Sequence, residues 1–477
     1  MTKSMFIYGV VVGGAFAVSG CGSAGSEGAD DGQVVSADSA LASGCKLDKE
    51  TRFFVPPPDP AAVKQIASLL RARDLKNAAR LTAMVTTPQA VWFTGGTPAE
   101  VEKAVKKTMA AAALEKRVPV LVAYNVPFRD CAQYSSGGAV DTAAYEAWID
   151  GFAKGIGKGQ AVVILEPDSL GIIPYNTTIY GTAEDCKPVV PAGSTTPAPG
   201  ASPEERYAQL QYAAKSLAAQ ALNTSVYLDG THAAWLGVGE AAYRIHKAGT
   251  DPVSGASLAK GFYVNASNFQ TTEQSIQFST WVSMCTAFAT NPDDNGWRLG
   301  NFSYCASQYN PATGYSLDYT PEYVATVTAQ IQGMMGNAVA SLPFVIDTSR
   351  NGKGTLNVSQ YSAEPYNQPD NVVSALKVGN WCNPPGAGLG PRPDASTGVA
   401  LLDAYLWLKI PGQSDGSCDI AGGARAWDYA QYNPWGLSGD DAQRHFDPLW
   451  GRVDPAAGAW FAAQALELAK NATPPLF

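Results

Sequence analysis

From about residue 49 onward, short apolar runs alternate with longer stretches in which apolar residues recur at helical spacing. The short runs predict β-strands, and the longer stretches predict helices. We expect strands at 90–93, 119–124, 161–165, 225–228, 261–264, 343–346 and 404–408. We expect helices near 60–73, 99–116, 141–155, 204–222, 321–340 and 455–470. This alternation predicts a parallel sheet with both faces covered, which explains why the strands are mostly apolar throughout.

A polar or aromatic residue stands at or just past the C-terminal end of nearly every predicted strand. These residues are Tyr124, Asp130, Glu166, Asp168, Asp229, Asn265, Asp347 and Lys409. Each alone would more often cap a helix or form a turn. In an α/β barrel, however, the C-terminal strand ends form the rim on which active sites are built. Together these residues predict a functional site at that rim.

The N-terminal segment is not expected to belong to this fold. Lys3 precedes an apolar run from about Met5 to Val18, which is shorter than the roughly 20 residues of a membrane span and is typical of a signal peptide. The run ends in Val18-Ser-Gly-Cys21, which resembles the lipobox of bacterial lipoproteins, whose cysteine is lipidated after cleavage. The alternative is a plain secretory signal with an incidental cysteine. We favour the lipoprotein, because Cys21 stands where the apolar run stops.

This leader divides the chain into three parts. Residues 1–21 are the predicted signal peptide, 22–44 are a flexible linker rich in Gly, Ser, Ala and Asp, and 45–477 are the folded domain. We therefore expect an extracellular or cell-surface protein that meets a membrane only through a lipid on Cys21.

Composition narrows the class of function. Of the 477 residues, 46% are hydrophobic and 16% are charged, which predicts a large core under a nearly neutral surface. The net charge of −9 argues against a nucleic-acid partner, because no basic stripe exists to neutralise phosphates. The three histidines are His232, His246 and His445, and no two lie at metal-ligand spacing. We therefore expect neither a metal site nor a histidine-based triad.

Cysteines and long insertions predict ordered loops. Export makes disulfides the default state of the cysteines. Pairing neighbours in the sequence gives Cys131–Cys186, Cys285–Cys305 and Cys382–Cys418, with Cys45 left over. Long segments without clear periodicity interrupt the alternation at 171–203, 266–320 and 412–453. We expect functional loops there, ordered by the cross-links.

Two segments carry the most specific chemistry. They are Ala123-Tyr-Asn-Val-Pro-Phe-Arg-Asp-Cys131 and Val163-Ile-Leu-Glu-Pro-Asp-Ser-Leu-Gly171. Each is an apolar run that ends in acidic groups, and paired carboxylates are the working groups of glycoside hydrolysis. We expect Asp168 to be the general acid, with its pKa raised by burial and by Asp130, and Arg129 to position or balance these charges. Taken alone, Glu-Pro-Asp would be read as a strand-end turn with a helix cap.

Both segments resemble, nearly residue for residue, the signature motifs of glycoside hydrolase family 6, the inverting cellulases. The resemblance implies a distorted seven-stranded parallel β/α barrel of TIM type with long active-site loops and a catalytic domain over 45–477. It implies cellulose and cello-oligosaccharides as partners, without metal or organic cofactor. It places the proton donor on Asp168, a sugar-distorting tyrosine on Tyr124, and a water-holding serine on Ser136 in a Ser/Gly loop.

Further matches extend the resemblance from about 52 to 470, and the first and last disulfides resemble two loop disulfides of the family. Asp415 falls on the proposed base, which would take the proton of water directly; alternatively, the proton would pass through a chain of waters past Ser136. Gln413 stands where the family usually has Glu, and Val238 where some members have a second tryptophan. The expected substrate contacts are Trp92, Arg129, Asp229, His232, Trp235, Asn265, Trp381, Lys409 and Gln413.

The resemblance implies a secreted, monomeric cellulase, and the long segments 171–203 and 412–453 favour an exo-acting cellobiohydrolase that encloses its substrate. The alternative is an endo-β-1,4-glucanase with an open cleft, which Val238 and the lack of a visible cellulose-binding module favour. An alternative of another class is a non-catalytic glycan-binding lipoprotein, for which Gln413 is the only argument. A serine esterase is discounted, because no Gly-x-Ser-x-Gly elbow with a supporting acid and histidine is evident.

Overall fold

The computed structural model describes residues 47–131, 134–309 and 319–477. Seven parallel strands form one sheet, in which the order in space is the order along the chain. The strands are β1 (Val91–Phe93), β2 (Val120–Ala123), β3 (Ala161–Leu165), β4 (Thr224–Asp229), β5 (Gly261–Val264), β6 (Phe344–Asp347) and β7 (Leu402–Leu406). The predicted parallel sheet is confirmed, and each strand begins within two residues of its predicted start.

The sheet curls until its first and last strands approach each other. The Ala90 amide, just before β1, donates a hydrogen bond of 2.9 Å to the Trp407 carbonyl, just after β7. The indole N–H of Trp92 donates to the Leu408 carbonyl at 2.7 Å. In a regular closed barrel, a ladder of backbone hydrogen bonds would join β1 to β7, and these two bonds lie at that position. The fold is therefore the distorted TIM-like barrel that was predicted.

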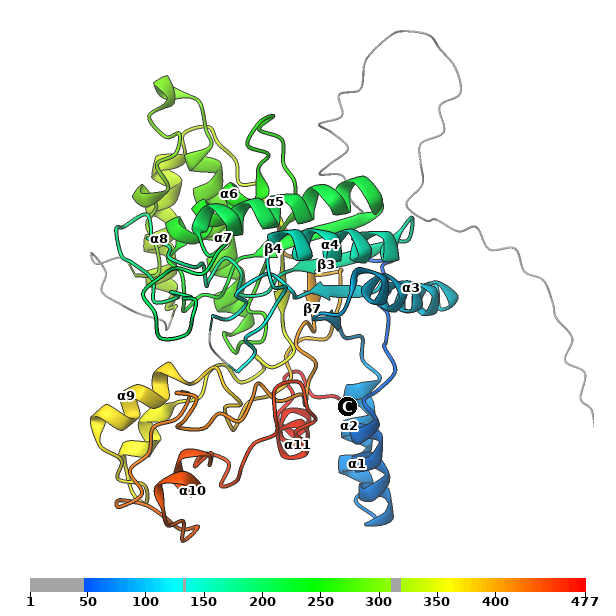
Figure 1. Ribbon diagram of the computed structural model, residues 1–477, viewed down its shortest axis with the longest axis vertical. Coiled ribbons are helices and arrows are strands. Elements are labelled where there is room, and N and C mark those ends of the chain that lie inside the picture. Colours follow the sequence, from blue (N-terminus) through cyan, green and yellow to red (C-terminus); the bar gives the residue numbers. More distant parts are fainter. Residues whose placement is uncertain (1–46, 132–133, 310–318) are drawn as a thin grey trace, which may run out of the picture. The chain divides into compact units, whose positions relative to one another are not determined.

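The α-helices of the described residues are α1 (Pro60–Arg71), α2 (Leu75–Val85), α3 (Pro98–Leu114), α4 (Thr142–Ile156), α5 (Pro203–Gln220), α6 (Val238–Gly249), α7 (Thr272–Ala289), α8 (Pro321–Met335), α9 (Asp370–Val378), α10 (Asp440–Arg444) and α11 (Ala462–Lys470). The helices from α3 to α8 cover the outside of this sheet (Figure 1). Short 3-10 turns lie at Asp294–Gly296, Phe302–Tyr304 and Val358–Ser362. Consecutive helices from α3 to α8 pack side by side, as repeated βα units require.

The prediction of a loop over all of 266–320 is wrong, because α7 occupies its first part. A capping box between Thr271 and Gln274 starts this helix. Its buried residues include Phe278, Ser283 and Met284, which lie on different sides of the helix, so no exposed polar stripe reveals the helical period. The helices α2, α6 and α9 also lie outside the predicted set, as does the short α10 within the predicted loop 412–453.

The strands separate two apolar cores. In β2, Val120 and Val122 belong to the cluster inside the barrel, while Leu121 and Ala123 pack against the helices. Because neither face of the sheet meets water, the strands read as continuous apolar runs.

All three predicted disulfides are present in the structure. The Cα separations are 5.7 Å for Cys131–Cys186, 5.8 Å for Cys285–Cys305 and 5.7 Å for Cys382–Cys418. Cys21 and Cys45 lie outside the described residues, as do the predicted signal peptide and linker. In the described part of the chain, no helix combines the length and the apolar character that crossing a bilayer requires.

Candidate active site

Four of the polar residues predicted at strand ends form a buried layer in the mouth of the barrel. Side chains alternate along a strand, so residues two positions past an inward residue point inward again. Glu166, Asp229, Asn265 and Asp347 continue the inward rows that contain Ile164, Tyr227, Tyr263 and Val345. None of the four is more than 2% exposed. They close the top of the barrel core with polar groups.

This layer holds the surrounding loops through backbone hydrogen bonds. The Glu166 Oε2 atom accepts the amides of Asn125 at 2.7 Å and Val126 at 2.9 Å, which follow β2. The Asp347 carboxylate accepts backbone amides of the loops after β5, β6 and β7, from Ser267, Ser349, Leu408 and Lys409. Asn265, predicted to bind substrate, uses its side-chain amide on the backbone of Gln270 and Asp347. These residues position the rim.

Asp229, also predicted to bind substrate, ties β4 to the loop that carries the predicted acid. Its Oδ2 atom accepts the amides of Leu170 at 3.0 Å and Gly171 at 3.2 Å, and its Oδ1 atom accepts that of Thr231 at 2.8 Å. Burial raises the pKa of Asp229 to about 6, although these three bonds oppose the shift. The Asp229 carboxylate therefore fixes the turn that follows Asp168.

Asp168 lies beyond this layer, at the end of a sharp turn. Glu166 and Asp168 both have left-handed backbone angles, with φ of 50° and 64°. Such non-glycine conformations persist where the surrounding structure enforces them. Burial raises the pKa of Asp168 well above its ordinary value, and the negative charges of Asp130, Asp229 and Asp415 raise it further. A carboxyl in this environment retains its proton toward neutral pH, as a general acid must.

Asp130 lies on the loop after β2, beside the aromatic ring of Tyr124. The Tyr124 hydroxyl donates to the Asp130 Oδ2 atom. Burial raises the pKa of Asp130 to about 6, against this hydrogen bond and the charges of Arg129, Arg206 and Lys409. The Arg129 guanidinium stacks on the Tyr124 ring, with its central carbon 4.2 Å from the ring centroid. The predicted group of Tyr124, Arg129 and Asp130 is therefore assembled in the structure.

Asp415 has the opposite environment. Its Oδ2 atom accepts Arg350 Nη1 at 2.7 Å and the Asn383 amide at 3.0 Å, and its Oδ1 atom lies 3.0 Å from Lys409 Nζ. Burial alone would raise its pKa, but the charges of Arg350 and Lys409 outweigh burial and hold it at about 2. Asp415 is therefore ionised at any pH at which the protein would be assayed.

The three predicted stacking tryptophans are all half-buried. Trp92 meets Tyr124 edge to face at 5.1 Å, and Trp381 lies 6.0 Å from Tyr134. The Trp235 ring lies 5.6 Å from His232, and a Cβ atom on Gly171 would come within 2.5 Å of it. Glycine at 171 therefore lets the turn after Asp168 lie directly against this indole.

His232 and Gln413 complete the predicted substrate contacts. Burial lowers the pKa of His232 to about 3, so its ring is neutral, and its Nδ1 atom accepts the Ala234 amide at 3.2 Å. Gln413 is half-buried and forms a backbone bridge with Trp460.

Ser136 is exposed, in a loop that is tied to the Asp130 segment. The Arg129 amide donates to the Gly137 carbonyl at 3.1 Å, and Arg129 Nε donates to the Ser135 carbonyl at 3.0 Å. The serine that was predicted to hold the attacking water is thus connected to the group around Asp130.

Two residues of this site were missed by the sequence analysis. Arg350 is fully buried and lies three residues after β6, so its position past a strand end was the available signal. Asn383 is also fully buried and bonds Asp415 in both directions, since the Asp415 amide donates to its Oδ1 atom at 2.9 Å. Its signal was its place in Asn380-Trp-Cys-Asn383.

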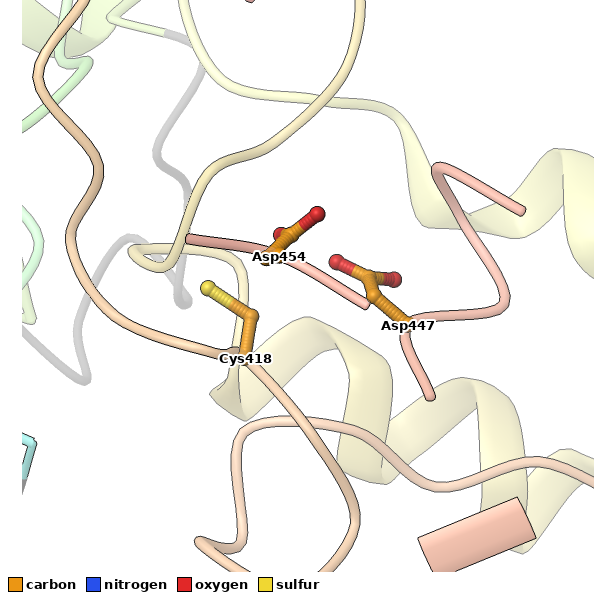
Figure 2. A group of neighbouring side chains, drawn as sticks. All are labelled: Cys418, Asp447 and Asp454. Carbon is orange, nitrogen blue, oxygen red and sulfur yellow. The ribbon is translucent and has the colours of Figure 1, made fainter. Parts of the chain in front are cut away.

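Among the described residues, one group has the composition of a metal site: Cys418, Asp447 and Asp454, whose side chains converge in Figure 2. The Cys418 sulfur, however, is bonded to Cys382. The Asp447 carboxylate receives Arg425 Nε at 3.0 Å and Nη2 at 3.1 Å. A disulfide sulfur and a carboxylate already paired with arginine do not fit a cation.

Comparison with known proteins identifies relatives of this arrangement. Residues 48–472 match the family model described as glycosyl hydrolases family 6. Endoglucanase A of Cellulomonas fimi is 30% identical over 397 residues, which are 83% of this chain and 56% of that protein. The probable 1,4-beta-D-glucan cellobiohydrolase C of Aspergillus niger is 27% identical over 417 residues, or 83% of this chain and 71% of that protein.

A solved structure of an endoglucanase is also similar to this chain. The endoglucanase Cel6 of Mycobacterium tuberculosis, in complex with methyl-cellobiosyl-4-deoxy-4-thio-β-D-cellobioside, superposes with a TM-score of 0.53 at 27% identity. The superposition covers 91% of this chain and 99% of that one. The similarity therefore includes nearly all of the barrel and its loops.

Proposed function

Because the chain belongs to family 6 of the glycosyl hydrolases, we propose that it hydrolyses β-1,4-glucosidic bonds of cellulose and cello-oligosaccharides with inversion. The observation that carries this proposal is the contrast between two carboxyls. Burial and neighbouring anions raise the pKa of Asp168, whereas Arg350 and Lys409 hold that of Asp415 at about 2. Titratable groups whose environments separate their pKa values in this way are the usual acid and base of a hydrolase.

In the proposed reaction, Asp168 donates its proton to the glycosidic oxygen of the leaving sugar. A water molecule attacks the anomeric carbon from the opposite face, and that carbon inverts. Asp130 remains an anion beside Asp168 and raises its pKa. Tyr124, held by Asp130, contacts the sugar that is distorted toward the transition state.

The proton of the attacking water is taken directly by Asp415, or it passes into a chain of waters past Ser136. A carboxylate with a pKa of about 2 is a weak base, and both of its oxygens already interact with cations. These contacts support the water-mediated route.

The stacking surfaces fit a glucan chain. Trp92, Trp235 and Trp381 are half-buried, so part of each ring remains available to the apolar face of a glucose unit. Lys409 and Arg129 supply hydrogen-bond donors among the carboxylates. These contacts select a neutral sugar polymer by shape and stacking.

We further propose that the enzyme acts from chain ends and releases cellobiose. The loop after β2 and the segment after β7 contact each other, since the Tyr134 hydroxyl lies 3.0 Å from the Asp419 carbonyl and 2.9 Å from its Oδ1 atom. The segment 171–203 is held by Cys131–Cys186 and by an ion pair of Glu184 with Arg244. Long loops that are fixed in this way favour an enclosed chain. The endoglucanase names of relatives favour the open-cleft alternative.

Export and attachment are part of the same proposal. A secreted monomer held by a lipid on Cys21 would place the folded domain next to an insoluble extracellular polymer. The sequence Val18-Ser-Gly-Cys21 supports it. Mass spectrometry of the N-terminal peptide from the expressing cell would detect the lipid, and an unmodified Cys21 would contradict this part.

The hydrolase proposal is tested with Asp168→Asn, which keeps the shape of the side chain but cannot donate an acidic proton. We expect activity on soluble cello-oligosaccharides to fall by about 10³-fold or more. Asp370→Asn, an exposed carboxylate in the first turn of α9, is the matched control and should behave as the parent. An unchanged rate in Asp168→Asn would reject the proposed acid.

The mode of attack is read from products. Cellobiose release from amorphous cellulose with little loss of viscosity of carboxymethyl-cellulose would support the exo mode. Rapid loss of viscosity with mixed oligomers would establish the endo mode. The absence of product from either polymer would favour a glycan-binding protein instead.

A further inference from the structure

Arg206 is a buried cation that joins the two loops carrying the proposed catalytic carboxyls. It lies in the first turn of α5 and is 2% exposed. Its Nη1 atom donates to the carbonyls of Ser169 at 2.8 Å and Ile172 at 2.9 Å, in the turn after Asp168. Its Nη2 atom donates to the Pro127 carbonyl at 2.8 Å, in the loop that leads to Asp130. One guanidinium thus spans both loops.

No carboxylate of the described chain lies within ion-pair distance of this guanidinium. Its three hydrogen bonds go to neutral carbonyls, and its Nε atom has no partner. A buried charge without a bonded counterion is costly unless charges at longer range compensate for it. The carboxyls whose charges act on Arg206 are Glu166, Asp130 and Asp229. The positive charge of Arg206 is therefore directed at the carboxyls of the site.

Arg244 shows the contrast. It is equally buried, on the next helix α6, and donates to the Leu170 carbonyl of the same turn at 2.6 Å. Two carboxylates neutralise it directly, because Glu240 accepts its Nε atom at 2.6 Å and Glu184 accepts its Nη2 atom. Arg244 therefore supports the turn without supplying an unpaired charge to the site.

We propose that Arg206 is a positioning residue that fixes the Asp130 and Asp168 loops relative to each other and keeps Asp130 ionised while Asp168 carries the proton. This inference rests on the proposed roles of Asp168 and Asp130. The span of the guanidinium ties the two loops together, and its charge adds to the charges that stabilise the anion at Asp130.

The electrostatic surroundings of Asp130 agree with this assignment. Burial raises its pKa to about 6, and the opposing influences are the Tyr124 hydrogen bond and the charges of Arg129, Arg206 and Lys409. The anion at Asp130 in turn raises the pKa of Asp168. Removing the charge at position 206 takes away one of the opposing influences, so the pKa of Asp130 must rise.

The experiment separates the geometry of Arg206 from its charge. Arg206→Lys keeps the charge but loses the planar fork, whereas Arg206→Gln keeps a donor but loses the charge. For the full-length protein, kcat and KM on cellohexaose are measured from pH 4 to pH 9, with the melting temperature. We expect Arg206→Lys to lower kcat by about 10-fold, with the acid limb of the pH profile unmoved.

For Arg206→Gln we expect kcat to fall by about 10- to 100-fold and the acid limb to move up by about one pH unit. KM should stay within about twofold in both variants, because no substrate contact is removed. Arg244→Lys is the matched control for a buried arginine on the same turn. It should lower the melting temperature and leave the acid limb in place.

Two outcomes overturn the inference. An acid limb that stays in place in Arg206→Gln would remove the electrostatic role. A kcat for Arg206→Lys equal to that of the parent would overturn the geometric role. This test remains possible if Arg206→Gln does not fold, because the lysine variant keeps the buried charge. Failure of the proposed function is recognised separately, because the parent itself would then release no product from cellohexaose.

Discussion

Single carboxyl groups in this site differ in what surrounds them, and their chemistry follows from that difference. Asp168 is surrounded by anions and has a raised pKa, whereas Asp415 lies between Arg350 and Lys409. The charge of Asp415 also contributes to the raised pKa of Asp168. The pKa of Asp168 therefore depends on the ionisation of Asp415.

The change Asp415→Asn tests this dependence. Loss of the anion lowers the pKa of Asp168, so the basic limb of the pH profile should move to lower pH. We expect kcat to fall by about 10²-fold or more, because two buried cations also lose their counterion. If Asp415 takes the proton of water directly, azide will restore the rate, whereas the water-mediated route predicts no rescue. Asp428→Asn, a half-buried turn carboxylate of the same segment, should leave both limbs in place.

Among the elements, the loops after β2 and β7 act as a pair. The Tyr134 side chain lies so close to Gly416 and Gly422 that a Cβ atom would come within 2.6 Å of its own Cβ atom from position 416 and within 2.3 Å of its ring from position 422. The Tyr134 hydroxyl is bonded to Asp419. The two loops are therefore connected by packing and by hydrogen bonds through a single side chain.

Replacing Tyr134 should release this connection. We expect Tyr134→Ala to increase the rate of viscosity loss on carboxymethyl-cellulose severalfold relative to cellobiose release, because an open cleft admits internal chain segments. Tyr134→Phe keeps the ring contacts and loses only the hydroxyl bonds, which contribute about 1 kcal/mol each, so its effect should be smaller. Equal product patterns for the parent and Tyr134→Ala would show that the contact does not enclose the substrate.

Across the whole molecule, buried carboxyls with raised pKa values link stability to pH. Burial raises the pKa of Asp130 and Asp229 to about 6, that of Glu166 to about 7 and that of Asp454 to about 9. The folded protein thus binds protons that the unfolded chain releases from about pH 4 upward. The free energy of unfolding should therefore fall as the pH rises from about 4 to 9, which melting curves at constant ionic strength will measure.

The alkaline end of this range tests Asp454. Burial raises its pKa, and the nearby Asp447 charge raises it further. Asp454→Asn keeps a neutral side chain at every pH and removes the cost of ionisation. We expect it to stabilise the protein at pH 9 by about 1–3 kcal/mol and to flatten the melting temperature between pH 7 and 9. Equal destabilisation at all pH values would contradict this expectation.

The neighbouring Asp447→Asn provides the control. Both Asp447 and Arg425 are fully buried, so this change leaves an arginine without its counterion. We expect a loss of about 3–5 kcal/mol at pH 7 that becomes smaller toward pH 9, because the Asp447 charge no longer raises the pKa of Asp454. At pH 9 the change in the free energy of unfolding should thus be positive for Asp454→Asn and negative for Asp447→Asn, although the two carboxyls lie close together.

The amino-acid sequence by itself determined the strands, the disulfide pairs and the segments that carry the site. These features depend on local patterns: apolar runs of strand length, cysteines that are neighbours in the sequence, and acidic residues directly after a strand. The segment 266–320 shows the limit of such patterns. Its helix α7 was not predicted, because it is buried on several sides and has no exposed polar stripe.

The tertiary structure alone decided what each strand-end residue does. Glu166 and Asp347 continue inward rows and bond the backbone, whereas Asp168 lies one turn further and faces other charges. The ion pair of Arg350 with Asp415 joins residues 65 positions apart, and Arg206 reaches Pro127 across 79 positions. Contacts of this range exist only after the strands have paired and the sheet has curled. Residue type and spacing therefore indicate where the chemistry lies, while closure of the barrel determines which charges meet.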